Sequence, residues 1–292
     1  MRRWFALCCV SIGALAAVGN VVPAKAIAIR LPSTAERAAM ADVIVVGKVT
    51  AFEDKLVEVE IAPGQKASYK IASIKVSATI GGANGLTHVR VGFIPAPAAA
   101  PVAPGGPIRP IRRGGYNPTL EVGQEGCFFL AKFAQGDFFV IPSLCQFVDK
   151  RIDGFDQQVA LVRKAVTVIA DPLKALKAKD PADRFEAAAI LLQKHGVYPT
   201  GRAGKMVRKP IAADESKLIL TAVLEADWSK TDDAAMSPLA VFQRLGLQPA
   251  DGFKYPQVKP GQDFNEVLQE SAKKWLKGHV NTYRVLHWVE DK

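Results

Sequence analysis

The spacing of apolar residues changes once along this chain, and that change constrains the fold more than any other feature. Up to about residue 150, β-branched residues alternate with polar ones at period two, as in strands with one buried face. From Phe155 onward, apolar residues recur every three to four positions, which is typical of amphipathic helices. The expected strands cover residues 42–49, 55–61, 69–80, 88–94, 127–133 and 137–141.

Capping signals mark where the helices of the second half begin. Asp171-Pro172 and Asp180-Pro181 each place an N-cap residue before a proline at the first helical position. Residues 201–210 are interpreted as a basic loop, and the last ten residues fit either a helix or a final strand. The expected helices cover residues 34–41, 155–169, 180–195, 214–227, 237–245 and 263–280.

These patterns predict an α+β chain of two modules. Residues 27–150 are expected to form an antiparallel β-barrel domain, and residues 151–292 an all-α helical domain. The barrel carries an insertion at residues 95–118, where 19 of 24 residues are proline, glycine, alanine or arginine. Such a composition buries little, so we expect an extended loop. Its arginines Arg109, Arg112 and Arg113 are the best local candidates for contact with an anionic partner, although exposed charges are commonly just solvated.

The first 26 residues have the order of a secretory signal peptide. Arg2 and Arg3 precede an apolar run that ends at Val18, and Ala24-Lys25-Ala26 supplies a small-x-small cleavage site. We expect cleavage after Ala26 and export to the periplasm or the exterior; the alternative is an uncleaved anchor. The apolar run is shorter than the roughly 18 residues that a membrane span needs, and no later run reaches that length. The mature chain is therefore expected to have no transmembrane span.

Charge and composition narrow the class of partner. The chain without residues 1–26 has 35 lysines and arginines against 28 acidic residues, and this small excess is dispersed along the sequence. Recognition of nucleic acid usually requires a concentrated basic face, so the charge pattern argues against that partner. The partner that we expect is another protein of the envelope or the extracellular space.

Cys127 and Cys145 are the two cysteines that remain after cleavage. They stand at almost equal distances on either side of Gly136, which lies in the turn of a predicted hairpin. An even pair in an exported chain favours one disulfide, because the compartment is oxidising. The alternative is a pair of reduced, buried thiols that pack as small apolar residues.

Several short motifs in the first half resemble one known family. "ADVIVVGKV", "YKIASIKVSATIGG", "HVRVGF" and "VGQEGCFFLAKF" followed by a later cysteine are similar to the tissue-inhibitor-of-metalloproteinase or netrin-like form of the OB barrel, over about residues 33–150. Members of that group inhibit through an N-terminal cysteine that chelates the zinc of the protease. Cleavage here would expose Ile27 instead, so only the barrel as a binding scaffold is carried over.

The second half resembles the helical tails of exported planctomycete-type proteins. The segments that carry this likeness are "DPLKALKAKDPADRFEAAAILLQKH" and "WLKGHVNTYRVLHWV". Some of these tails are HEAT-like, and the resemblance implies no particular function. It supports the expectation that the second module is helical.

The sequence shows no recognisable catalytic or metal-binding motif. The four histidines lack the spacing of a zinc site, so we expect neither a cofactor nor a metal. Aromatic residues of the strands could stack on single-stranded nucleic acid, but alternation places several of them in the core. These residues are Phe93, Phe129, Phe133, Phe138 and Phe139.

The leading functional hypothesis is an exported, non-catalytic interaction module of the cell envelope. A second hypothesis is a divergent protease inhibitor that uses a loop in place of an N-terminal cysteine. A third is an enzyme whose site is assembled from residues that are scattered in the sequence.

Overall fold

A computed structural model describes residues 31–62, 64–82, 84–95, 119–142, 145–199, 202, 204–229 and 236–291. The signal peptide predicted at residues 1–26 lies outside these residues. So does nearly all of the proline-rich insertion, with Arg109, Arg112 and Arg113. The chain from Leu31 to Lys292 forms one compact unit, and the predicted boundary near residue 150 stays a prediction.

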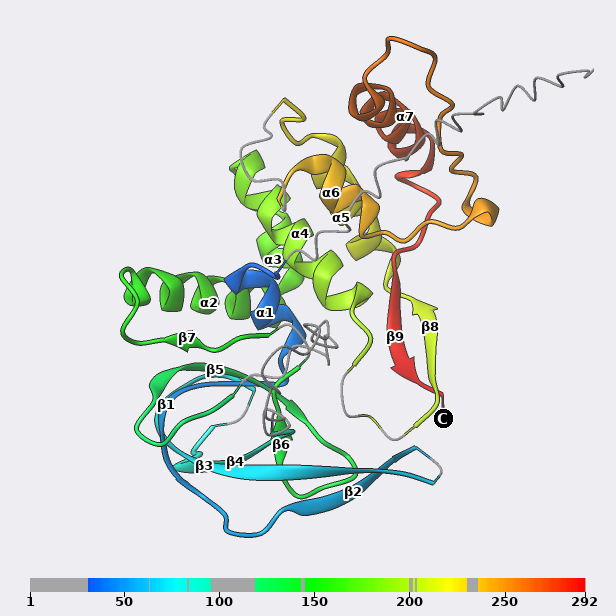
Figure 1. Cartoon of the computed structure of the whole chain (residues 1–292). Helices are drawn as coiled ribbons and strands as arrows, with labels where there is room; N and C mark the ends of the chain where they lie inside the picture. The colour runs from blue at the N-terminus through cyan, green and yellow to red at the C-terminus, as the bar shows by residue number, and fades with distance from the viewer. Residues whose placement is uncertain are drawn as a thin grey trace, which may run out of the picture. The chain divides into compact units, whose positions relative to one another are not determined.

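The first half forms a sheet of seven strands whose pairing closes on itself. The path β1-β3-β4-β6-β5 returns to its start because β5 also pairs with β1, while β2 pairs with β3 and β7 with β5. Figure 1 shows these strands curving beside one another. Their bounds are Val43–Phe52 for β1, Val57–Ala62 for β2, Gln65–Gly81 for β3, His88–Phe93 for β4, Glu125–Lys132 for β5, Phe139–Val140 for β6 and Val148–Asp149 for β7.

The predicted fold class, an antiparallel OB-like barrel followed by an all-α domain, is wrong on two counts. The sheet is mixed, because β4 and β6 run parallel with Val91 opposite Phe139. The second half is not all helical, because β8 (Met206–Pro210) and β9 (Leu286–Glu290) form an antiparallel two-stranded sheet. The chain is therefore a mixed α/β fold. The prediction missed β8 because Arg208 and Lys209 give its segment the composition of a basic loop, and because its partner strand lies far along the chain.

Seven helices occur among the described residues, and their starts follow the capping signals. The Asp171 side chain accepts a hydrogen bond from the Lys174 amide, and the Asp180 side chain accepts one from the Ala182 amide, which confirms both Asp-Pro starts. The helices are α1 (Thr34–Met40), α2 (Phe155–Ala170), α3 (Pro172–Leu176), α4 (Pro181–Gly196), α5 (Ala213–Leu224), α6 (Pro238–Gln243) and α7 (Phe264–His279).

Strand β5 is buried on both faces and so connects two hydrophobic cores. Phe128 and Leu130 pack with residues of the other strands in the core of the sheet. Cys127 and Phe129 point the other way and join the large core formed by the helices. All four side chains are fully buried. This double burial explains why the segment reads as a continuous apolar run rather than as an alternating strand.

Candidate functional site

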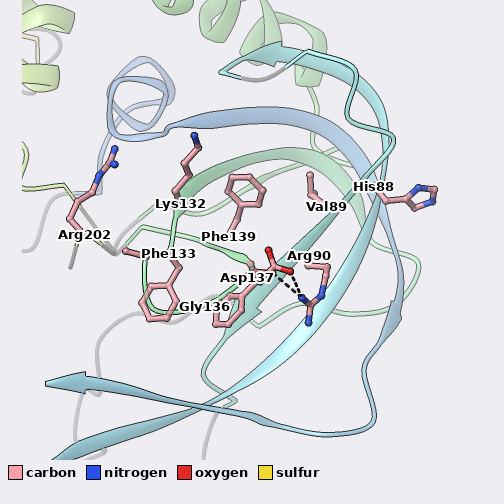
Figure 2. Close-up of a pocket in the computed structure, with 11 residues that line it drawn as sticks. His88, Val89, Arg90, Lys132, Phe133, Gly136, Asp137, Phe139 and Arg202 are labelled. Atoms are coloured by element: carbon pink, nitrogen blue, oxygen red, sulfur yellow. Dashed lines mark hydrogen bonds and ion pairs between the residues drawn. The ribbon is translucent and has the colours of Figure 1, made fainter. Parts of the chain in front are cut away.

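The candidate site is a cavity of about 520 Å³ beside the turn that joins β5 to β6. Its walls come from the start of β4, from the end of β5, from the turn itself and from Arg202, a residue far along the chain. We call it the aromatic cavity, and Figure 2 shows its lining. The lining residues are His88, Val89, Arg90, Lys132, Phe133, Ala134, Gly136, Asp137, Phe138, Phe139 and Arg202.

Phe133 and Phe138 of the cavity lining belong to a cluster of three rings, whose third member, Tyr69, supports them from outside the lining. The ring centroids of Phe133 and Phe138 lie 5.1 Å apart, and Tyr69 of β3 lies 5.2 Å from Phe133 and 5.3 Å from Phe138. Tilted contacts at such distances add to the stability that burial gives each ring. Burial also raises the pKa of the Tyr69 hydroxyl. Each ring is thus held by the other two, which gives the cavity a rigid apolar base.

Two glycines leave the space that the Phe138 ring occupies. A Cβ atom on Gly92 of β4 would lie 2.3 Å from Cε2 of Phe138, and a Cβ atom on Gly136 would lie 2.4 Å from Cε1. Both distances are far below van der Waals contact, and an aromatic ring cannot bend away as a flexible chain end can. The turn glycine expected from sequence therefore has a second role, which is to admit the ring that forms the base of the cavity.

Three cations stand on the rim of the cavity, and two of them, Arg90 and Arg202, form ion pairs with carboxylates. Nε of Arg90 donates to Oε1 of Glu53 at 2.8 Å, and its Nη1 lies 3.4 Å from Oδ2 of Asp137. The hydrogen bond that Arg90 donates to Glu53 is the main reason why the pKa of Arg90 is raised. In Figure 2, Lys132 and Arg202 stand apart from this ion pair, and His88 points away from the other labelled side chains.

Asp42, just before β1, positions two groups of the rim. Its Oδ1 accepts a hydrogen bond from Nη2 of Arg202 at 3.3 Å, and its Oδ2 accepts one from the Lys132 amide at 3.0 Å. Asp42 therefore holds Arg202, which is distant in sequence, beside the end of β5. Three side chains of the lining are cationic, Arg90, Lys132 and Arg202, against the single carboxylate of Asp137.

The lining of this cavity combines aromatic rings with charged side chains. Its carboxylate, on Asp137, is exposed and paired with Arg90. Among the residues that the structure describes, no group of three or more His, Cys, Asp or Glu could hold a metal ion. Aromatic rings with guanidinium groups around them are the combination enriched where proteins contact proteins.

Cys127 and Cys145 are both buried and unbridged in the structure. The hairpin that was expected to bring them together ends at β6, and the residues opposite Cys127 are Val46 of β1 and Val148 of β7. The Cys145 thiol instead contacts Sδ of Met40 at 3.7 Å. Burial raises the pKa of each thiol to about 12. The disulfide stays a prediction for the exported protein.

The five aromatic residues that the sequence pattern placed on strands differ in how far they are buried. Four are buried: Phe93, Phe129, Phe133 and Phe138. Phe139 is half-buried and lines the cavity. This matches the expectation that alternation places several of them in the core.

Sequence reasoning missed the cations of the rim, because Arg90, Lys132 and Arg202 come from three segments and belong to no motif. The one signal that could have found two of them is alternation: Arg90 on β4 and Lys132 at the end of β5 are polar positions next to buried ones. Arg202 carries no such signal.

No protein-family model matches the chain, and no curated protein matches it. The likeness to the netrin-like barrel therefore stays a prediction. Within the described part of the chain, no helix is long and apolar enough to cross a membrane.

Proposed function

We propose that this chain is an exported, non-catalytic binding module whose aromatic cavity takes an acidic, apolar segment of another protein. The observation that supports this proposal most is the cavity of about 520 Å³ with an apolar base and a cationic rim. Its size suits one or two side chains of a partner. An aromatic or aliphatic side chain would contact Phe133, Phe138 and Phe139, and an adjacent carboxylate would meet Lys132 or Arg202.

The rigidity of the base is the second support. Phe138 is enclosed by Gly92, Gly136 and the rings of Tyr69 and Phe133, so binding would not need to order it. A preformed pocket loses less conformational entropy on binding than a mobile one, so more of the contact energy appears as affinity. Pockets that anchor a single side chain in this way dominate the energetics of many protein interfaces.

An array of twelve-residue peptides that vary in acidic and aromatic content tests the proposal. The purified mature chain should bind peptides in which Asp or Glu stands next to Phe, Leu or Trp, and it should ignore the same peptides with Lys in place of the acid. Lys132→Glu reverses one charge of the rim, and we expect about five-fold weaker binding, since exposed ion pairs contribute up to about 1 kcal/mol.

Lys254→Glu is the matched control, because Lys254 is equally an exposed lysine but lines neither this cavity nor the second one described below. It should leave binding unchanged. Binding that is independent of the acidic residues, or that Lys132→Glu and Lys254→Glu weaken equally, would contradict the proposal.

A further inference from the structure

A second cavity, of about 360 Å³, lies where the end of α4 meets β9 and the segment between α1 and β1. We call it the lysine cavity. It shares Arg202 with the aromatic cavity, and its other residues are its own. The residues that matter here are the cationic or titratable Lys194, His195, His287 and Arg202, the acidic Asp42, and the apolar Trp288.

Lys194 is the unusual group of this cavity. Burial lowers the pKa of its ammonium, although nearby Asp42 raises it, and Arg202 lowers it further. No hydrogen bond or ion pair joins Lys194 to any residue within the described ranges. A partly buried ammonium without a hydrogen-bonded anion is costly, because the charge of Asp42 offsets only part of the desolvation.

Asp42, which lines the cavity, and Glu215, which contacts its residue His195, are already engaged by other groups. Asp42 accepts hydrogen bonds from Arg202 and from the Lys132 amide. Glu215 of α5 contacts the His195 ring, and the distance from its Oε1 to Nε2 of His195 is 3.1 Å. The His195 ring also meets the ring of His287 edge-on, with centroids 5.7 Å apart. The cavity therefore presents Lys194, Arg202 and two imidazoles, and its one lining carboxylate is occupied.

The C-terminus of α4 carries partial negative charge, but it does not cancel the excess of cationic side chains in the cavity. Its last carbonyl, that of Gly196, accepts a hydrogen bond from Nε1 of Trp288 at 3.3 Å. The Gln193 carbonyl accepts one from the Val197 amide at 3.2 Å. Since these acceptors already have donors, the end of the helix repels an anion less than free carbonyls would.

The remaining wall of the cavity is apolar. Trp288 of β9 lines it together with side chains of α1, α2 and α4. These apolar residues are Ala39, Met40, Ala131, Ile169, Pro172, Leu191, Val197 and Pro199. A ligand that fills the cavity thus needs a hydrophobic body as well as an anionic head group. Its volume is near the lower limit for small-molecule pockets, so the body must be small.

We propose that the lysine cavity binds a small carboxylate with an apolar body, with its carboxylate on Lys194 and its body against Trp288. The His195 ring, oriented by Glu215, and Arg202 flank the head group. This inference rests on the contacts of the lysine cavity alone and does not depend on the binding of a protein segment in the aromatic cavity.

Calorimetric titration of the mature chain with phenylacetate tests the inference, with phenylacetamide as the neutral isostere. We expect one molecule of phenylacetate to bind per chain and the amide to bind at least ten-fold more weakly, because a hydrogen bond to a charged group is lost. N-acetylphenylalanine, titrated in parallel, distinguishes a free acid from the C-terminal carboxylate of a polypeptide: the tighter ligand of the two identifies the source.

Lys194→Met keeps the aliphatic stem and removes the charge. We expect at least a ten-fold loss of phenylacetate affinity, while the melting temperature without ligand stays the same or rises, because a desolvated charge has been removed. Lys277→Met, in the last turn of α7 as Lys194 is in the last turn of α4, is the matched control and should bind as the wild type does.

Lys132→Glu should also leave phenylacetate binding unchanged. A failure of the proposal for the aromatic cavity is therefore distinguishable from a failure of the inference for the lysine cavity. The inference is overturned if phenylacetate does not bind the folded wild-type chain, if the amide binds equally well, or if Lys194→Met remains folded and retains full affinity.

Discussion

The carboxylate of Glu36 in α1 forms an ion pair with Arg244 at the end of α6, with Oε1 2.5 Å from Nη2. Glu36 is 1% exposed and Arg244 12% exposed, so the pair is almost fully removed from water. Glu36 also accepts from the Ser33 amide at 2.6 Å, and Nη1 of Arg244 donates to the Ala189 carbonyl of α4 at 3.2 Å. One buried pair thereby joins the helix that precedes the sheet to helices of the second half.

Glu36→Gln should destabilise the protein strongly. The substitution removes the Glu36 charge from its ion pair with the buried Arg244 guanidinium, and breaking such a pair costs about 3–5 kcal/mol. Glu58→Gln is the control, because Glu58 pairs with Lys66 at 3.7 Å on the exposed surface, where a pair contributes at most about 1 kcal/mol. Urea unfolding measures both changes. Equal, small losses for the two variants would show that the Glu36–Arg244 pair does not join the two halves.

Gly92→Ala should disturb the aromatic cavity. The added Cβ would lie 2.3 Å from the Phe138 ring, and forcing extra atoms into a packed site costs about 1–3 kcal/mol. Gly278→Ala in α7 has open space around its Cβ and should instead stabilise the helix by about 0.5–1 kcal/mol. Thermal unfolding compares the two variants. If Gly92→Ala melts at the wild-type temperature, the Phe138 ring is not packed against Gly92.

The buried thiols should resist alkylation in the folded protein at pH 8, because burial raises the pKa of Cys127 and Cys145 to about 12. Unfolding in the presence of iodoacetamide and without reductant should then give two adducts per mature chain, which lacks Cys8 and Cys9, counted by mass spectrometry. No adducts after unfolding would instead establish the disulfide that the sequence predicts.

The same raised pKa values make stability depend on alkaline pH. The unfolded thiol loses its proton near its ordinary pKa of about 9, whereas the folded thiol keeps it until about 12. The contribution of the thiols to stability is therefore complete below pH 9 and is lost as the pH rises toward 12. By pH 10 the loss should be about 1.4 kcal/mol for each thiol. Cys127→Ala should lose correspondingly less stability between pH 8 and pH 10, and an unchanged pH dependence in this variant would argue that Cys127 is ionised or bridged.

The sequence predicted the strands better than their pairing. The run at residues 42–49 became β1, and the turn at Gly136 became the β5–β6 hairpin. Alternation reports which face of a strand is buried, but it does not report the neighbour of that strand. The pairing of β1 with β5 and the parallel pairing of β4 with β6 join segments that are distant in sequence, so no local pattern encodes them.

The candidate site was less accessible to sequence reasoning than the fold. Phe138 and Gly136 stood out as an aromatic residue of a strand and a turn glycine, but their contact with Gly92 depends on how β4 packs against the turn. Likewise, Arg202 becomes part of the rim only because Asp42, which lies 160 positions earlier in the sequence, binds it.

The most direct test of the proposed function maps the ligand onto the sheet by nuclear magnetic resonance. An acidic, aromatic peptide selected on the array is added to the labelled mature chain until binding is complete. The amide signals of Gly136, Asp137 and Phe139 should shift most, while those of Trp228 and Gly278, which line neither cavity, stay in place. Shifts confined to residues outside the β5–β6 turn and β4 would contradict the assignment of the aromatic cavity as the binding site.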